Sequence, residues 1–264
     1  MSAYCVVPNL ILYGIAAFMA FLGHWMQLPT VSRWALRFFW LGVGVHSLYL
    51  ALLVGWLGRP FLATRGILIG LLTWTCALIY AWLARDTRWR QFSAWFLPIV
   101  FLIFLHSIAR GPEYSIIHGL LPAVWAGSIH LGAATVGLGC SFIGGLIAII
   151  LLRMMARIKS RRPGPLWLSS PSLPALERSM TAILAIGFVA LTVTLATGVV
   201  LTAWTATATW VPWSHGGTAL LAWGCYGFLL TSRWHLGAMG RKGALLACLG
   251  GIILICSFVE VHLQ

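Results

Sequence analysis

The side chains best suited to chemistry in this sequence are its histidines. An ionisable residue inside an apolar segment is costly unless it has a partner, so a histidine there is a candidate functional residue. A hydrogen bond to a neighbouring helix is the competing explanation for any single one. Eight histidines occur among the 264 residues: His24, His46, His106, His118, His130, His215, His235 and His262.

The spacing of these histidines narrows the chemistry. No two of them follow the i, i+3 or i, i+4 spacing of a zinc site on one helix, and no cysteine accompanies them at the usual ligand spacing. Ligands that come singly from different helices instead suit a haem iron held between two imidazoles. The four acidic residues are too few for chemistry based on paired carboxylates, and the six cysteines contain no CxxC motif.

Long apolar segments must position the histidines. The chain is 61% hydrophobic and 8% charged, whereas an ordinary soluble domain has about 25% charged residues. Because backbone polar groups in lipid must be satisfied internally, the sequence predicts an all-α integral membrane protein. A bilayer core takes a helix of about 20 residues to cross. Hydropathy predicts a bundle of about eight such spans, at approximately 10–28, 38–57, 66–83, 92–109, 129–152, 180–204, 216–232 and 244–261.

The formal net charge of +13 indicates topology rather than nucleic-acid binding. Fourteen of the 17 basic residues fall in alternate connections between the spans, and only Arg59, Arg65 and Arg110 fall in the others. Because basic residues concentrate on the cytoplasmic side of a membrane, we expect the larger group inside and both termini outside. We expect membrane lipid around the helices and no nucleic-acid partner.

The connections suggest how the chain is organised. Residues 153–179 contain four prolines and a cluster of positive charge, which favours a cytoplasmic linker that ends in a short surface helix near 173–178. We expect one polytopic membrane domain over 1–264, with four helices in 1–109 and four in 129–264. The half-polar segment 110–130 is typical of an amphipathic stretch along the outer membrane face, where it would cover an external site.

This topology brings three histidines to one membrane face. His130 begins the fifth span, His215 begins the seventh and His262 ends the eighth. His24 and His46 lie instead in the first two spans, between the inner half and the middle of the bilayer. Three tryptophans near His215 either extend an aromatic belt or offer apolar faces to a flat ligand: Trp204, Trp210 and Trp213.

Small residues share a helix face with His130. A stripe of this kind lets another backbone or a flat macrocycle approach closely, and helix packing is the simpler of these explanations. The stripe consists of Ala134, Gly137, Ser141 and Gly145. The sixth span has a similar face, which we interpret mainly as packing, at Thr194, Thr197 and Gly198.

The C-terminal half resembles the cytochrome c assembly family of membrane proteins, the CcsA/CcmC/HemX-like group, and most closely its small eight-helix branch. The matching segments occur in order: "SIHLGAATVGLGCSFIGGLIAIILL" with His130, "LPALERSMTAILAIGFVALTVTLATGVVL" with Glu177, "LLAWGCYGFLLTSRW" with Trp223, and "GRKGALLACLGGIILICSF". In the N-terminal half, "GVGVHSLYL" with His46 resembles the second helix of the same branch.

The resemblance implies haem handling in a bacterial inner membrane, with a non-covalent b-type haem as cofactor. It matches His130 to an outer haem-ligating histidine at the head of its helix, and His46 to an intramembrane one. His262 lies near the place of a second outer histidine in the larger synthases. The synthases also carry a tryptophan-rich motif of the form WGxxWxWDPKET, and here "ATATWVPWSHGGT" keeps Trp213 but has no acidic residue and no lysine–glutamate pair.

The leading interpretation is therefore a haem-delivery or assembly factor rather than an enzyme. His130 with either His262 or His215 is the predicted outer pair, and His46, alone or with His24, is the inner candidate. Trp210 and Trp213 would lie against the porphyrin. The alternatives are a structural or regulatory subunit without cofactor and a b-type electron-transfer subunit. The expected partners are other cytochrome assembly proteins or respiratory-complex subunits.

Overall fold

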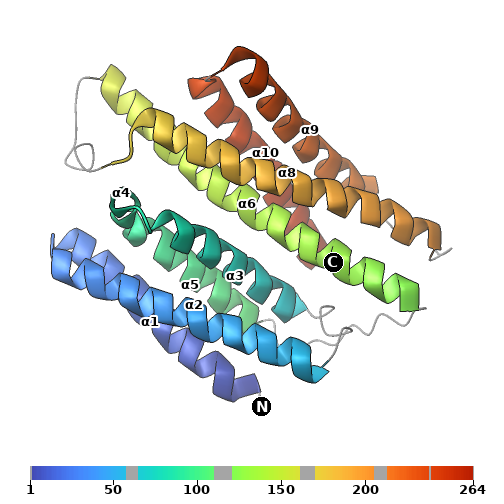
Figure 1. Ribbon diagram of the computed structural model, residues 1–264, viewed down its shortest axis with the longest axis horizontal. Coiled ribbons are helices and arrows are strands. Elements are labelled where there is room, and N and C mark those ends of the chain that lie inside the picture. Colours follow the sequence, from blue (N-terminus) through green and yellow to red (C-terminus); the bar gives the residue numbers. More distant parts are fainter. Residues whose placement is uncertain are drawn as a thin grey trace. The chain divides into compact units, whose positions relative to one another are not determined.

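The computed structural model describes residues 2–57, 65–109, 121–160, 170–204, 213–237 and 239–263. Every regular element in these ranges is a helix, which confirms the predicted all-helical fold. The contacts between helices divide the chain into two compact units, Met1–His118 and Gly119–Gln264, which we call unit 1 and unit 2 (Figure 1).

Each predicted span corresponds to one helix. Unit 1 contains α1 (Ser2–Trp25), α2 (Pro29–Leu57), α3 (Arg65–Leu83), the single-turn α4 (Thr87–Arg90) and α5 (Ser93–Ala109). Unit 2 contains α6 (Leu121–Lys159), α8 (Leu173–Trp204), α9 (Trp213–Leu236) and α10 (Gly240–Leu263).

Six of these helices are long and apolar enough to cross a membrane: α1, α2, α3, α6, α8 and α10. The helix α5 is apolar but only 17 residues long, and α9 is not among the six in the part of the chain that the structure describes. The chain is a multi-pass membrane protein, with six of the eight predicted spans supported by length and composition. The orientation with both termini outside stays a prediction.

A tight turn joins α1 to α2 in unit 1. The Leu28 amide donates to the Gly23 carbonyl at 2.9 Å and the Gln27 amide to the His24 carbonyl at 3.4 Å, while Gln27 adopts a φ of 56°. This pattern is a Schellman motif, which ends a helix by one left-handed residue. Pro29 then begins α2, where its fixed φ suits the first helical position. His24 therefore lies at the end of α1, in the turn.

The four helices of unit 2 form a ring in the order α6, α8, α9, α10, and α10 returns to α6. Figure 1 shows α6 and α8 side by side along most of their lengths. Their close approach depends on small residues, because a Cβ on Gly137 would lie 2.9 Å from Leu191 Cδ2 and one on Gly187 would lie 2.8 Å from Cys140 Cβ. At these positions, small residues of α6 and α8 serve helix packing.

The connection between α6 and α8 is shorter than the predicted linker 153–179. The helix α6 continues to Lys159, because Arg153 and Arg157 lie exposed on its surface and do not end it. Residues 173–178 form the first turns of α8 rather than a separate surface helix, since Pro174 falls in the first turn, where a missing amide proton costs no hydrogen bond.

The predicted amphipathic segment 110–130 also differs from the structure. From Leu121 onward it belongs to the continuous helix α6, and residues 110–120 lie outside the described part of the chain.

One acidic residue joins three helices at the end of unit 2 where α8 begins. Glu177 is buried, and its Oε1 accepts hydrogen bonds from the amides of Met239 at 2.8 Å and Gly240 at 3.2 Å. The same oxygen lies 2.9 Å from Arg233 Nη1 near the end of α9. Because the first amides of a helix have no partner within it, Glu177 caps α10 and ties α8, α9 and α10 together.

Candidate functional site

His130 is held by two oxygen atoms of the neighbouring helix α8. The ring lies half-buried, with Nδ1 2.9 Å from the Thr194 carbonyl oxygen and 3.2 Å from Thr197 Oγ1. A carbonyl oxygen only accepts hydrogen bonds, so in the neutral imidazole Nδ1 carries the proton and Nε2 carries a lone pair. A histidine that ligates a metal usually donates its other ring N–H to an acceptor in this way.

The face of α8 at Thr194, Thr197 and Gly198, which we interpreted mainly as packing, does pack on α6, and the residue that it contacts there is His130. A Cβ on Gly198 would lie 3.3 Å from His130 Cε1 and 3.6 Å from Nδ1. The imidazole therefore lies against the backbone of α8 at a position without a side chain.

His262 lies in α10 at the same level as His130 in α6. The start of α10 approaches the end of α6, where a Cβ on Gly240 would lie 3.5 Å from Met155 Cε, so these helices are antiparallel. Further along, a Cβ on Gly251 would lie 3.5 Å from the Ser141 carbonyl oxygen. His262 follows Gly251 by eleven residues and His130 precedes Ser141 by eleven, which is about three turns, or ~16 Å, along each helix.

His215 reaches the same level from α9. Thr218 Oγ1 donates to Ser257 Oγ of α10 at 2.8 Å. His215 precedes Thr218 by three residues and His262 follows Ser257 by five, so the two histidine positions differ by roughly 3 Å in height. We call this end of unit 2 the His130 end. The side chains of His215 and His262 lie outside the described part of the structure.

The register of unit 2 therefore brings three predicted ligand positions to one level on three helices. His262 occupies a helix adjacent to that of His130, and His215 occupies the helix across the ring. The two outer pairs, His130 with His262 and His130 with His215, stay predictions. Trp210 lies outside the described residues, and the side chain of Trp213, the first residue of α9, is likewise not described.

His46 in unit 1 has a different environment. It is fully buried, and its Nδ1 lies 3.2 Å from the hydroxyl oxygen of Tyr13. Phe104 packs edge-on against its ring, with centroids 5.3 Å apart. Its Nε2 has no hydrogen-bond partner within the described residues. The imidazole is enclosed by aromatic rings of α1, α2 and α5.

The structure separates His24 from His46, against the predicted inner pair. Tyr13 marks the level of His46 on α1, and His24 follows it by eleven residues, or about 16 Å along the helix. Imidazole nitrogens on opposite sides of one iron lie about 4 Å apart, given metal–nitrogen bonds of ~2 Å. The cause is the turn after Trp25, which places His24 at the end of α1 rather than beside the middle of α2.

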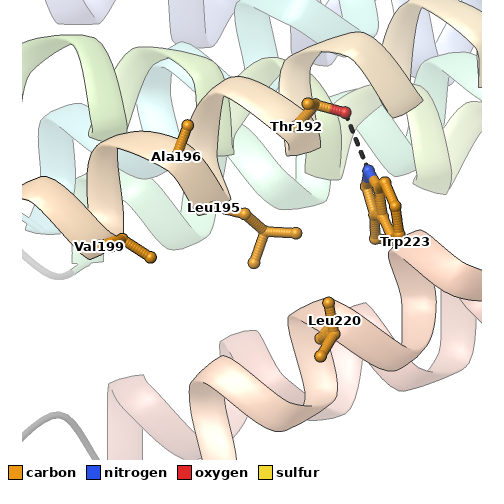
Figure 2. Close-up of a pocket in the computed structure, with 6 residues that line it drawn as sticks. All are labelled: Thr192, Leu195, Ala196, Val199, Leu220 and Trp223. Carbon is orange, nitrogen blue, oxygen red and sulfur yellow. Dashed lines mark hydrogen bonds between the residues drawn. The ribbon is translucent and has the colours of Figure 1, made fainter.

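An apolar groove of about 280 Å³ lies between α8 and α9 (Figure 2). At one end, Trp223 Nε1 donates a hydrogen bond to Thr192 Oγ1 at 2.8 Å, and Phe188 stacks on the indole with centroids 5.1 Å apart. The groove is lined by Thr192, Leu195, Ala196, Val199, Leu220 and Trp223. The groove lies on the side of α8 that is turned toward α9. Thr194, Thr197 and Gly198 lie on the side of α8 that contacts His130 of α6.

Comparison with known proteins identifies one match. A family model described as cytochrome c assembly protein matches residues 62–263. The match includes His130, His215 and His262, and it begins after His24 and His46. No curated protein and no solved structure matches the chain.

Proposed function

Since the chain belongs to the cytochrome c assembly protein family, we propose that it binds haem in the membrane and acts in cytochrome c maturation as a delivery or assembly factor. His130 holds a non-covalent b-type haem at the outer face together with a second histidine, His262 or His215. The observation that carries this proposal is the hydrogen bond from His130 Nδ1 to the Thr194 carbonyl oxygen at 2.9 Å, which leaves Nε2 as a nitrogen donor.

The residues at the His130 end fit such a group. A haem supplies an iron whose axial positions accept imidazole nitrogens, and the three histidine positions come singly from different helices at one level. In this proposal the three tryptophans that lie near His215 in the sequence supply apolar faces to the porphyrin: Trp204, Trp210 and Trp213. His46 is a second, intramembrane site in this proposal. Its Nε2, which has no hydrogen-bond partner among the described residues, would ligate the iron once the surrounding rings separate.

We propose an assembly role without catalysis, in a bacterial inner membrane. The segment "WVPWSHGGT" has no acidic residue and no lysine–glutamate pair, which are the features of the synthase motif that this chain does not share. Other cytochrome assembly proteins or respiratory-complex subunits are the partners that receive or donate the haem.

An absorption spectrum tests the proposal. The protein is purified in mild detergent, supplied with hemin, freed of excess hemin and scanned for a Soret band. We expect a Soret band in the wild type that is largely lost in His130→Ala and kept in His235→Ala, whose histidine is exposed near the end of α9. His262→Ala and His215→Ala then identify the second ligand, because only one of them should match the loss in His130→Ala.

Two results would overturn the haem proposal. One is a wild type without a Soret band, and the other is a band that His130→Ala and His46→Ala leave unchanged. A wild type without haem that co-purifies with a stoichiometric partner would favour a structural or regulatory subunit instead.

A further inference from the structure

We infer that Thr197 and Gly198 are positioning residues that hold His130 in one tautomer and one orientation, with Nε2 as its ligand nitrogen. The inference about the tautomer concerns the ligand-free protein. Its consequence for haem affinity rests on the proposed function.

Gly198 exposes the carbonyl group that His130 binds. In an α-helix each Cα–Cβ bond tilts toward the N-terminus, so a side chain at position 198 leans toward the carbonyl of Thr194, one turn earlier. With glycine there, the imidazole reaches the Thr194 oxygen at 2.9 Å. A Cβ would lie 3.3 Å from Cε1, which is closer than an ordinary van der Waals contact and displaces the ring.

Thr197 makes the opposite tautomer unfavourable. Its hydroxyl donates to the Val193 carbonyl at 2.7 Å and lies 3.1 Å from the Thr194 carbonyl, so its proton is used within α8. Oγ1 therefore presents a lone pair to His130 Nδ1 at 3.2 Å. The Thr194 carbonyl oxygen and Thr197 Oγ1 both face Nδ1 as acceptors. If Nδ1 were unprotonated, its lone pair would face the lone pairs of these two oxygens, and no hydrogen bond would form.

The arrangement prepares the other ring nitrogen for a metal. A hydrogen bond from Nδ1–H to a carbonyl fixes the tautomer, orients the ring and makes the ligating nitrogen more basic. Loss of such an outer-shell partner typically lowers metal affinity by about 10- to 100-fold. The short segment Thr194–Gly198 thereby orients the His130 imidazole through one backbone carbonyl and one hydroxyl group.

Two variants of α8 test the inference, each with a matched control. Gly198→Ala adds the Cβ that meets the ring, and Gly132→Ala adds a Cβ with no atom within 4 Å, two residues from His130. Thr197→Val removes the hydroxyl with little change of shape. Thr202→Val makes the same change on the same helix, where the hydroxyl bonds the Val199 carbonyl of α8.

The first measurement needs no haem. Long-range ¹H–¹⁵N correlation spectra of the ¹⁵N-histidine-labelled protein, assigned with His130→Ala, report which ring nitrogen carries the proton. We expect the Nδ1–H tautomer in the wild type and both controls, and a mixture of tautomers in Gly198→Ala, where the ring is displaced from the Thr194 carbonyl. Thr197→Val keeps this carbonyl and should show a smaller share of the Nε2–H tautomer, still above that of its control. An Nε2–H tautomer in the wild type, or variants indistinguishable from their controls, would overturn the inference.

The second measurement is the dissociation constant for hemin. We expect it to rise about tenfold in Gly198→Ala and Thr197→Val and to stay unchanged in the controls. If the wild type binds no hemin while the tautomer result holds, the proposed function fails and the positioning role stands. If hemin binds through His130 but the tautomer is insensitive to both variants, the positioning role alone fails. Thr197→Val keeps the test available if Gly198→Ala does not fold.

Discussion

The polar side chains His130 and Glu177 of unit 2 are held differently from His46 of unit 1. In unit 2, His130 binds a backbone carbonyl and a hydroxyl of α8, and Glu177 binds two backbone amides and Arg233. In unit 1, His46 has one tyrosine hydroxyl at 3.2 Å and aromatic rings around it, and its Nε2 is unpaired within the described residues.

The difference concerns how firmly a side chain is fixed before any ligand arrives. Backbone atoms of packed helices cannot rotate away, so His130 and Glu177 have positions set by helix register. The hydroxyl of Tyr13 rotates, and Nε2 of His46 has no hydrogen-bond partner in the described part of the chain. A buried polar atom without a partner is costly, which makes His46 the weaker structural element and the one with spare bonding capacity.

The largest expected effect is at Glu177. Glu177→Ala removes the carboxylate that caps α10 and leaves Arg233, whose side chain is 27% exposed, without its counter-charge. Breaking a buried ion pair from one side costs about 3 kcal/mol or more, so the free energy of unfolding in mixed detergent–SDS micelles should fall by about that amount. Arg178→Ala, at the exposed neighbouring position, is the control and should change it by less than ~0.5 kcal/mol.

A smaller Glu177 effect, equal to that of Arg178→Ala, would mean that unit 2 does not depend on this carboxylate. The contrast with His46 would then rest on His130 alone.

The next effect is in unit 1, where Gly42 makes room for the partner of His46. A Cβ on Gly42 would lie 2.9 Å from Tyr13 Cε1, so Gly42→Ala should displace the tyrosine ring. Overpacking of this kind costs about 1–3 kcal/mol, measured by the same unfolding assay. Gly44→Ala is the matched control on α2, because a Cβ there meets no atom within 4 Å. Equal stability of the two variants would show that the Tyr13 ring can move freely beside His46.

Hydropathy predicted the helices well but not their ends. The middle of each helix consists of apolar residues, which hydropathy identifies directly from the sequence, as in α8. The ends depend on local chemistry: Arg153 and Arg157 extend α6 because long basic side chains remain in water while their helix continues, and the left-handed Gln27 ends α1 one turn before the predicted span ends.

The common level of His130, His215 and His262 was predictable from the alternation of the spans, because helix ends on the same side of a membrane lie at a similar depth. The support of His130 by Thr194 and Gly198 was not, since it depends on the register between α6 and α8. The separation of His24 from His46 follows from the turn geometry, and the role of Glu177 depends on where α10 begins. A signal was available for Glu177, which is one of only four acidic residues and lies beside an apolar segment.

A moderate effect is expected when His46 loses its hydroxyl partner. Tyr13→Phe keeps the buried ring and removes the oxygen 3.2 Å from Nδ1. Leaving a buried polar atom unpaired costs about 1–3 kcal/mol, so the unfolding free energy should fall within that range. Stability equal to the wild type would mean that the hydroxyl contributes no net hydrogen bond to His46.

The smallest effect is expected when both members of this pair become apolar. His46→Leu alone leaves the Tyr13 hydroxyl buried without its partner, and should cost about as much as Tyr13→Phe. In Tyr13→Phe/His46→Leu, no polar atom of the pair remains, and replacing both partners by apolar groups of similar shape is nearly neutral. The unfolding free energy of the double variant should therefore lie within about 1 kcal/mol of the wild type, a smaller loss than the sum of the two single losses.

Additive losses would show that His46 or Tyr13 is stabilised by contacts other than the hydrogen bond between them. His46 would then be held as firmly as His130. A near-neutral double variant would instead indicate that the fold of unit 1 does not need this histidine, so that its presence in the interior calls for a ligand.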